Sequence, residues 1–232
     1  NELGLKEFER HYKDGDLISL THLNENGNKD KKIYYKDEKR VVFGTYWKNG
    51  HKRKEGHLNN GIEDGPCTEW YENGQKSSEG HYKDGKEEGL WTYWYENGQK
   101  KSEVNYKDGK EDGLWTFWNE NGEKYAEVHM KGGKSNGLSI TWYEDGQKKS
   151  EEHYREGKKD GLSTSWYENG KKWYLRRYKD GEKDGLDTEW YLNGAKRIEE
   201  HYKNGVKDGR LTRWSKDGEK KYEKHFKDGS EK

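Results

Sequence analysis

Apolar and polar residues follow one another in short alternating stretches along this chain, and from residue 41 to residue 229 the pattern recurs every 24 residues. One period holds two stretches of roughly eight residues that are rich in Trp, Tyr and Thr. Neither stretch has the 3.6-residue apolar spacing of a helix, so both are predicted to be β-strands. A period kept without a slip indicates a stack of one supersecondary unit instead of a single wrapped core.

Two glycine signals divide each period. Asn97-Gly98 lies between the two strands of one period, and Asp108-Gly109 lies between that period and the next. Asn-Gly and Asp-Gly pairs adopt the positive φ that tight hairpin turns require. Each period is therefore predicted to form one β-hairpin, and the next hairpin follows at once.

The register of the hairpin depends on the loop around Asn97-Gly98. If residues 96–98 form a three-residue loop with a glycine bulge, Trp94 lies opposite Lys100 and Leu90 lies opposite Val104. A two-residue Asn-Gly turn would exchange the two faces of the second strand. We prefer the first register, in which a lysine stem covers an indole and helps to hold the hairpin.

Comparison of the periods with one another separates constant positions from variable ones. Leu90, Thr92 and Trp94 recur with little change and share one side of a strand, whereas the positions of Trp91 and Tyr93, on the other side, vary freely. The constant tryptophans, which lie 24 residues apart, are predicted to pack in a repeated structural layer: Trp70, Trp94, Trp118, Trp142, Trp166, Trp190 and Trp214.

The variable positions hold five aromatic residues that are expected to form a local cluster of rings: Trp91, Tyr93, Trp115, Phe117 and Trp173. Such a cluster is a candidate site for a binding partner. The alternative is that these rings only staple the central hairpins together.

The composition restricts both fold and function. Only 26% of the chain is hydrophobic and 40% is charged, so a conventional two-layer core is not expected. Eleven Trp and eighteen Tyr in strict register argue against disorder. The 46 basic and 46 acidic side chains are interleaved, which removes the electrostatic footprint of a nucleic-acid-binding protein. Cys67 is the only cysteine and is interpreted as structural, and no apolar run approaches the roughly 20 residues of a membrane span.

Most histidines occupy one column of the repeat, as His129 and His153 do, with a glutamate two residues earlier. A metal or acid/base site is disfavoured, because equivalent positions in successive hairpins lie about 9.6 Å apart, whereas ligands lie about 2.0–2.2 Å from a metal. The column is predicted to form a ladder of Glu and His side chains with cross-strand hydrogen bonds on a solvated face. No triad or phosphate loop stands out, so no catalytic residue, metal site or cofactor is predicted.

Residues 70–91 read Trp-Tyr-Glu-Asn-Gly-Gln-Lys-Ser-Ser-Glu-Gly-His-Tyr-Lys-Asp-Gly-Lys-Glu-Glu-Gly-Leu-Trp. This segment resembles the variant MORN repeat (membrane occupation and recognition nexus) of bacterial proteins often labelled YwqK family antitoxins. Residues 79–85 parallel the general pattern Tyr-x-Gly-x-Trp-x-x-Gly, with Tyr82 in the aromatic place. The resemblance implies an all-β repeat protein: an elongated, twisted, single-layer antiparallel sheet of about nine tandem hairpins, without catalytic residues of its own.

The resemblance covers residues 41–229 well and residues 1–40 loosely, where Tyr12-Lys-Asp-Gly15 and Asn24-Glu-Asn-Gly27 are recognisable. We therefore expect divergent N-terminal repeats or a cap over residues 1–40, tandem repeats over residues 41–229, and a short tail over residues 230–232. The divergent start and the charged tail are expected to blunt the open edges of the sheet.

These observations favour a non-enzymatic scaffold that docks a protein partner, such as a toxin that it neutralises or a component of the bacterial envelope. An aromatic hairpin-repeat module that binds carbohydrate or cell wall is the alternative, and binding to a membrane surface is a further one. Met130 is the only methionine, so the chain begins without an initiator. A cleaved export signal or a trimmed chain would explain this, which leaves envelope, secreted and cytoplasmic locations open.

Overall fold

A computed structural model of the chain describes residues 8–14, 16–24, 26–36 and 40–232. Over these residues the regular structure is entirely β, with 21 strands and no helix. Within the same ranges no helix is long and apolar enough to cross a membrane. The contacts divide the chain into two units: unit 1 extends to Glu111 and includes residues 119–122, and unit 2 comprises residues 112–118 and 123–232.

The strands of unit 1 are β1 (Phe8–Lys13), β2 (Asp16–Leu23), β3 (Lys29–Tyr35), β4 (Arg40–Tyr46), β5 (Lys52–Asn59), β6 (Ile62–Trp70), β7 (Lys76–Lys83), β8 (Lys86–Trp94), β9 (Lys100–Lys107) and β10 (Lys110–Glu111). The strands of unit 2 are β11 (Gly113–Trp118), β12 (Lys124–Lys131), β13 (Lys134–Trp142), β14 (Lys148–Arg155), β15 (Lys158–Trp166), β16 (Lys172–Lys179), β17 (Glu182–Trp190), β18 (Lys196–Lys203), β19 (Val206–Trp214), β20 (Lys220–Lys227) and β21 (Ser230–Glu231).

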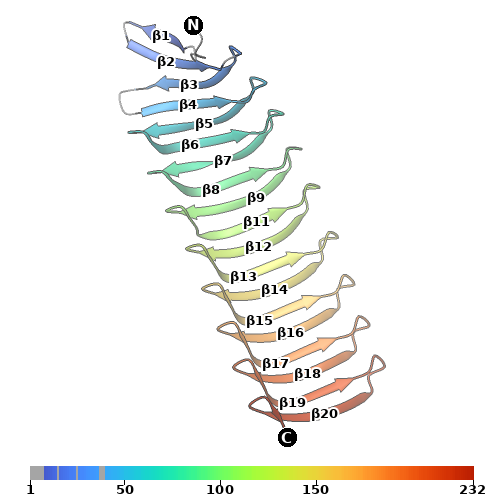
Figure 1. The fold of residues 1–232 in the computed structure, drawn as a ribbon. Coiled ribbons are helices and arrows are strands. Elements are labelled where there is room, and N and C mark those ends of the chain that lie inside the picture. Colours follow the sequence, from blue (N-terminus) through green and yellow to red (C-terminus); the bar gives the residue numbers. More distant parts are fainter. Residues whose placement is uncertain (1–7, 15, 25, 37–39) are drawn as a thin grey trace. The chain divides into compact units, whose positions relative to one another are not determined.

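In each unit every strand pairs antiparallel with the strand that follows it in the sequence, as β7 does with β8 and β13 does with β14 (Figure 1). The predicted fold class, an all-β repeat protein built from tandem antiparallel hairpins, is confirmed. Strands β1 to β3 continue this pairing within the described part of residues 1–40. Residues 1–7, 15, 25 and 37–39 of the predicted cap lie outside the described residues, and the proposed domain boundaries stay a prediction.

The two glycine signals form the two predicted kinds of turn. Asp84 and Gly85 have φ values of 50° and 77°, as a two-residue type I′ turn requires. At the other end of the strands, the N–H of Tyr95 donates to the carbonyl of Gln99 and the N–H of Gly98 donates to the carbonyl of Tyr95, both at 2.9 Å. Residues 96–98 therefore form the predicted three-residue loop, and Trp94 lies opposite Lys100.

The predicted register fails beyond that point. A bulge between Tyr93 and Trp94 places Tyr93 opposite Ser102, so that Trp91 lies opposite Val104 and Leu90 lies opposite Asn105. The expected Leu90–Val104 pair is wrong, because the bulge adds one residue to the second strand and exchanges its faces. The hairpin thus combines the loop of one predicted register with the strand faces of the other.

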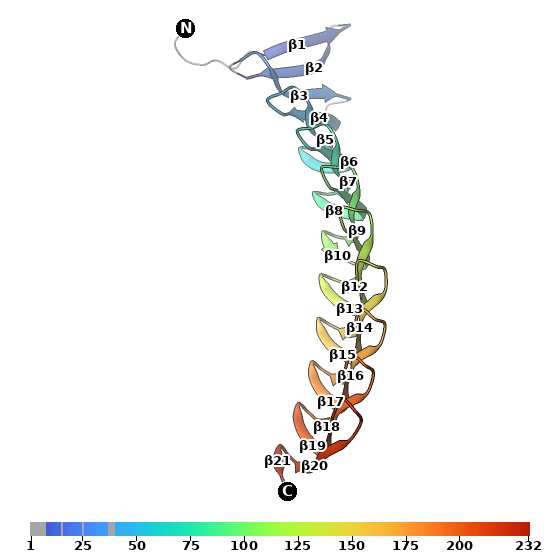
Figure 2. The ribbon, with the colours of Figure 1, turned by 90° about the vertical axis from the view of Figure 1, so that its right-hand side faces the viewer.

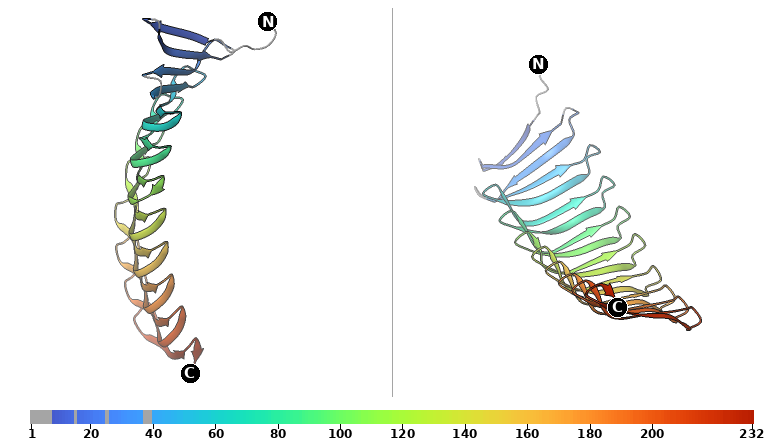
Figure 3. Two further views of the ribbon diagram at one scale, coloured as in Figure 1. Left: turned by 90° about the vertical axis from the view of Figure 1, so that its left-hand side faces the viewer. Right: turned by 60° about the horizontal axis from the view of Figure 1, so that its bottom comes forward.

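A second irregularity joins each hairpin to the next. His57 lies in a register shift between Gly56 and Leu58, where β6 contributes additional residues that include Gly65 at φ 126°. Bulges of this kind bend a strand and increase its twist. Figure 2 shows the resulting curvature of the individual hairpins in unit 2, and Figure 3 shows it from the opposite side.

We call the side of the sheet formed by the strand ends with three-residue loops the loop edge. Side chains there connect each hairpin to the next. In unit 1 the Tyr71 hydroxyl donates to the carbonyl of Trp94 at 2.7 Å, and the Asn73 amide donates to the carbonyl of Glu96 at 3.0 Å. Unit 2 repeats the tyrosine bond three times: Tyr143 to Trp166, Tyr167 to Trp190 and Tyr191 to Trp214. A spacing of 23 residues between donor and acceptor recurs in each bond.

The opposite strand ends carry the two-residue turns, and we call them the turn edge. Backbone N–H groups there donate hydrogen bonds to the neighbouring hairpin. The N–H of Gly205 donates to the carbonyl of Lys183 at 2.9 Å, and the N–H of Asn204 donates to Asp184 Oδ2 at 3.2 Å. Equivalent bonds recur at other two-residue turns of unit 2, as from Gly181 to the carbonyl of Lys159. At both edges, backbone carbonyls accept hydrogen bonds from the neighbouring hairpin. Without these bonds, the same carbonyls in a single-layer sheet would bond water.

Burial on the two sides of the sheet differs in part from what the variation between periods indicated. We call the side that carries Trp91 and Val104 the inner face, and the side that carries Leu90, Thr92 and Trp94 the outer face. Trp91 and Val104 are each 4% exposed, whereas Leu90 is 51% exposed. The prediction that the constant side is the packed one is therefore wrong at Leu90. It holds at the constant threonine position of the outer face, where Thr188 and Thr212 are each 3% exposed.

Candidate functional site

The inner face of unit 1 contains an aromatic cluster centred on Trp91. Its indole meets the ring of Tyr82 edge-on at 5.0 Å between centroids and stacks on the ring of Tyr93 at 6.2 Å. The indole N–H donates to the carbonyl of His81 at 3.2 Å. Burial, with a hydrogen bond to Tyr106, raises the pKa of Tyr93. Trp91 and Tyr93 do come together as predicted, but they fill the inner face and leave little of Trp91 accessible.

Cys67 and Lys54 lie beside this cluster. Lys54 Nζ lies 2.8 Å from Glu63 Oε1 and 3.4 Å from Glu69 Oε1. Burial disfavours the Lys54 cation, but these carboxylates outweigh that effect and raise its pKa. Cys67 is 2% exposed, and burial raises the pKa of its thiol to about 11. A thiol of this kind is inert at neutral pH, which supports the structural interpretation of Cys67.

The inner face of unit 2 begins with a second pair of predicted site residues. Trp115 and Phe117 meet edge-on at 5.6 Å, and Phe117 lies 6.0 Å from the ring of Tyr125. The Nε1 atom of Trp115 is buried and has no hydrogen-bond partner within the described part of the chain. The two rings therefore contact each other, as expected.

Trp173, the fifth predicted site residue, makes different contacts. Its indole is 44% exposed and lies 5.9 Å from the ring of Tyr167 and 5.3 Å from that of Tyr174, in the hairpin of β15 and β16. Its ring contacts are thus to rings of its own hairpin and not to Trp115 or Phe117. The predicted single cluster of five rings is wrong, because Trp173 is the extra residue of the bulge in β16 and alternation cannot locate it.

Further along unit 2 the inner face becomes ionic. Glu152 accepts hydrogen bonds from Lys159 and Tyr154, each at 2.6 Å. Glu200 likewise accepts hydrogen bonds from Lys207 at 2.9 Å and from Tyr202 at 2.6 Å. Burial alone would raise the pKa of both carboxyls, but these donors outweigh it and lower both pKa values. The ionic groups satisfy one another, so they stabilise the layer and offer no free acid or base.

The constant tryptophans lie on the outer face and contact lysines of the preceding hairpin. Lys76 Nζ lies 5.8 Å from the ring centroid of Trp94 and forms an ion pair with Glu79. The same Lys-over-Trp contact recurs at Trp70, Trp142, Trp166, Trp190 and Trp214. A lysine ammonium therefore lies over each of these indoles, but the contact joins two hairpins, whereas the expected lysine contact would have closed one.

The histidine column has a structural role on the outer face. His129 Nδ1–H donates to the carbonyl of Leu138 at 2.9 Å, and its Cβ atom packs against Gly137, where a side chain would meet it at 3.2 Å. His57, His153 and His201 make the same bond to the carbonyls of Pro66, Leu162 and Arg210. The predicted cross-strand bonds exist, but the acceptor is a backbone carbonyl of the next hairpin, and Glu127 bonds Lys124 instead. In residues 8–14, 16–24, 26–36 and 40–232 no group of three or more His, Cys, Asp or Glu side chains is placed to hold a metal ion.

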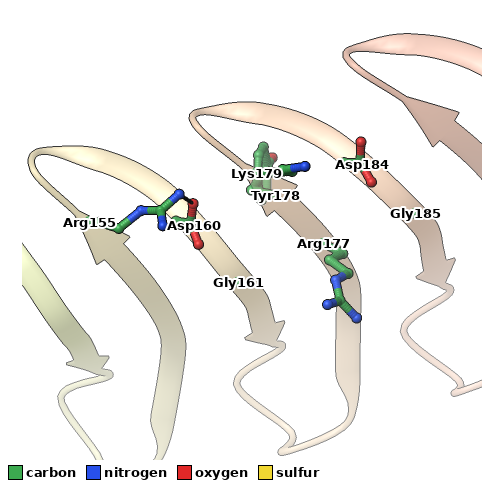
Figure 4. A pocket seen from close by; sticks show the side chains of 8 residues that line it. All are labelled: Arg155, Asp160, Gly161, Arg177, Tyr178, Lys179, Asp184 and Gly185. Atoms are coloured by element: carbon green, nitrogen blue, oxygen red, sulfur yellow. Dashed lines mark hydrogen bonds and ion pairs between the residues drawn. The ribbon is translucent and has the colours of Figure 1, made fainter.

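Two accessible features of unit 2 escaped the sequence analysis. One is a row of leucines on the outer face, in which Leu114, Leu162 and Leu186 are 36%, 50% and 40% exposed. The other is a groove of about 560 Å³ lined by Arg155, Asp160, Arg177, Tyr178, Lys179 and Asp184 (Figure 4). The constancy of leucine on one strand face could have indicated the row. The groove could have been indicated by Arg155 and Arg177, which replace the residues that most periods have at the same positions.

Comparison with known families agrees with this geometry. The family described as MORN repeat variant matches residues 63–84, 87–108, 111–131, 135–156 and 159–180. The match therefore consists of five tandem segments of the chain. MORN repeats are generally associated with protein and membrane binding, and the proteins that carry them are generally non-enzymatic. No curated protein matches the chain. The hairpins that follow the matched MORN repeats keep the same loop and turn geometry up to β20.

Proposed function

We propose that this MORN-repeat chain is a non-enzymatic scaffold that binds a protein partner through the outer face of unit 2. The observation that carries the proposal is the leucine row. Leu114, Leu138, Leu162 and Leu186 occupy the same position of β11, β13, β15 and β17 and lie opposite His129, His153, Arg177 and His201, respectively. Exposed apolar side chains that gather in one row, bordered by polar residues, are typical of a protein interaction surface.

The scaffold itself supports the proposal. Bonds along both edges of unit 2 hold each hairpin against the next, and the Glu152 and Glu200 carboxylates of the inner face are hydrogen-bonded within the layer. The outer leucines are therefore presented on a pre-organised frame, which lowers the entropy lost on binding. The resemblance to YwqK-type antitoxins makes a toxin or an envelope protein the first partner to test.

The experiment is affinity capture with the whole chain and two triple variants. One variant carries Leu114→Ser, Leu162→Ser and Leu186→Ser. The control replaces three exposed apolar residues outside the row, Leu192, Val206 and Tyr222, by Ser. Far-UV circular dichroism establishes that both variants remain folded. Loss of a purified partner from the row variant alone supports the proposal, and equal binding by all three chains, or equal loss from both variants, overturns it.

A carbohydrate-binding role is the second candidate, and Trp173 favours it. Its half-exposed indole, backed by Tyr167 and Tyr174, forms a small aromatic platform of the kind on which sugar rings stack. A glycan array probed with the whole chain and with Trp173→Ser tests this role. Glycan binding that requires Trp173 but not the leucine row would replace the protein-binding proposal.

A further inference from the structure

Two departures from the repeat line the groove of Figure 4. The column of Arg155 holds lysine at residues 83, 107, 131, 179, 203 and 227, and the column of Arg177 holds histidine at residues 57, 81, 129, 153, 201 and 225. Arginine occurs only once in each of these two columns. Both arginines line the same groove in unit 2, on β14 and β16.

Residue 177 is arginine where most periods have histidine, and its guanidinium lacks the hydrogen bond that the histidines make. The Arg177 stem packs against Gly185 as the histidines do against their glycines, since a Cβ at residue 185 would lie 3.3 Å from Arg177 Cδ. A histidine here would donate to the carbonyl of the next hairpin. Among the described residues, the Arg177 guanidinium has no hydrogen bond or ion pair and remains exposed.

The acidic residues of the groove are already engaged. Arg155 Nη2 lies 2.6 Å from Asp160 Oδ2 and 2.9 Å from Asp180 Oδ1. Asp184 accepts the N–H of Asn204 at the neighbouring turn. Lys179, like Arg177, has no partner in the described part of the chain. The groove therefore combines two unpaired cations with carboxylates that are held by other groups.

From this geometry we propose that the groove, which Lys179 also lines, binds a small oxyanionic group, a carboxylate or a phosphate, through the Arg177 guanidinium. A planar guanidinium offers two parallel N–H donors to such a group. The Asp160 and Asp184 carboxylates also border the groove. The site borders the leucine row, because Arg177 lies opposite Leu162, but it does not require the proposed protein partner.

The test is an NMR titration of the whole chain with glutarate and, separately, with inorganic phosphate at low ionic strength. The Arg177 Nε–Hε resonance and the amides of Gly161 and Gly185 are expected to shift and to saturate. Arg177→His restores the residue of the column and its Nδ1 donor, so it is expected to fold normally and to weaken binding by about tenfold or more, through loss of a bidentate charge-assisted pair.

Arg197→Lys serves as the matched control, because Arg197 is an exposed arginine of β18 that stacks on Tyr191 outside the groove. It is expected to bind both probes like the unmodified chain. Arg177→Gln repeats the test if Arg177→His does not fold. Saturable binding of either probe that depends on Arg177 supports the site, and the better probe identifies carboxylate or phosphate as its source. Shifts that do not saturate, or that persist unchanged in both Arg177 variants, overturn it.

Discussion

The indole of Trp91 covers Gly80 so closely that a Cβ at residue 80 would lie 2.1 Å from the ring. The backbone of Gly80 does not have the positive φ that would by itself require glycine. Later periods hold larger residues at this position, including Val104, which lies opposite Trp91, and Val128, which lies opposite Trp115. The large ring of one hairpin and the missing side chain of its neighbour are therefore complementary.

This contact predicts that Gly80→Ala lowers the free energy of unfolding by about 1–3 kcal/mol, because overpacking forces the indole to move. Urea denaturation followed by circular dichroism measures the change. The same substitution is expected to be much less harmful in a Trp91→Leu background, where the ring is absent. An equal penalty in both backgrounds would show that the ring is not the cause.

Burial of Cys67 predicts a thiol that reacts only when the chain opens. With a pKa of about 11, its thiolate fraction at pH 8 is about one in a thousand, compared with about one in four for an unfolded thiol of pKa ~8.5. Alkylation by iodoacetamide, followed by mass spectrometry, is expected to be at least about a hundredfold slower in buffer than in denaturant. Comparable rates in the two conditions would contradict the burial of Cys67.

The lowered pKa of Glu200 predicts a contribution to acid sensitivity. Because its folded-state pKa lies below the unfolded value, Glu200 stabilises the fold above the unfolded pKa of ~4.3, and this contribution is lost as the pH falls through the lowered folded-state pKa. Urea midpoints of the unmodified chain and of Glu200→Gln, measured between pH 6 and pH 3, provide the comparison. The variant is expected to be less stable at pH 6 but to lose less stability on acidification, and parallel pH profiles would exclude this role.

The tyrosine hydrogen bonds of the loop edge predict that loss of a bonded hydroxyl destabilises the fold, whereas loss of an unbonded one does not. Tyr143→Phe removes a hydroxyl that donates to the carbonyl of Trp166 at 2.7 Å, and should cost about 0.5–1.5 kcal/mol. Tyr222→Phe is the control, since Tyr222 is 40% exposed and has no hydrogen bond among the described residues. Its effect is expected to stay within about 0.5 kcal/mol. Thermal unfolding of both variants decides whether the edge bonds stabilise the array.

The hairpins and their turns could be predicted because local chemistry determines them. Asp84-Gly85 and Asn97-Gly98 carry the turn geometry in their own backbone preferences, and the pairing of Trp94 with Lys100 follows from the loop between them. The strand faces could not be predicted in the same way. The bulge residues Lys101 and Trp173 look like ordinary strand residues, and a single extra residue reverses the side on which all later residues lie.

The candidate site was predicted less well for a related reason. Periodic constancy was interpreted as burial, yet in a single bent layer the constant Leu90 and Trp94 serve contacts between hairpins on the accessible side. The clustering of Trp91 with Tyr93 and of Trp115 with Phe117 was recognisable, because residues two apart on a strand share a face. The groove depended on side chains of β14 and β16 that only the folded stack brings together.

The constant offset of the edge bonds bears on how such a chain changes length in evolution. Tyr143, Tyr167 and Tyr191 each donate to a carbonyl 23 residues ahead, and that carbonyl belongs to a tryptophan of the 24-residue series. Deletion of residues 144–167 would bring the carbonyl of Trp190 to the place that the carbonyl of Trp166 now holds beside Tyr143. Because duplication preserves the offset in the same way, unequal recombination between repeats can add or remove whole hairpins while every remaining bond keeps its partner type.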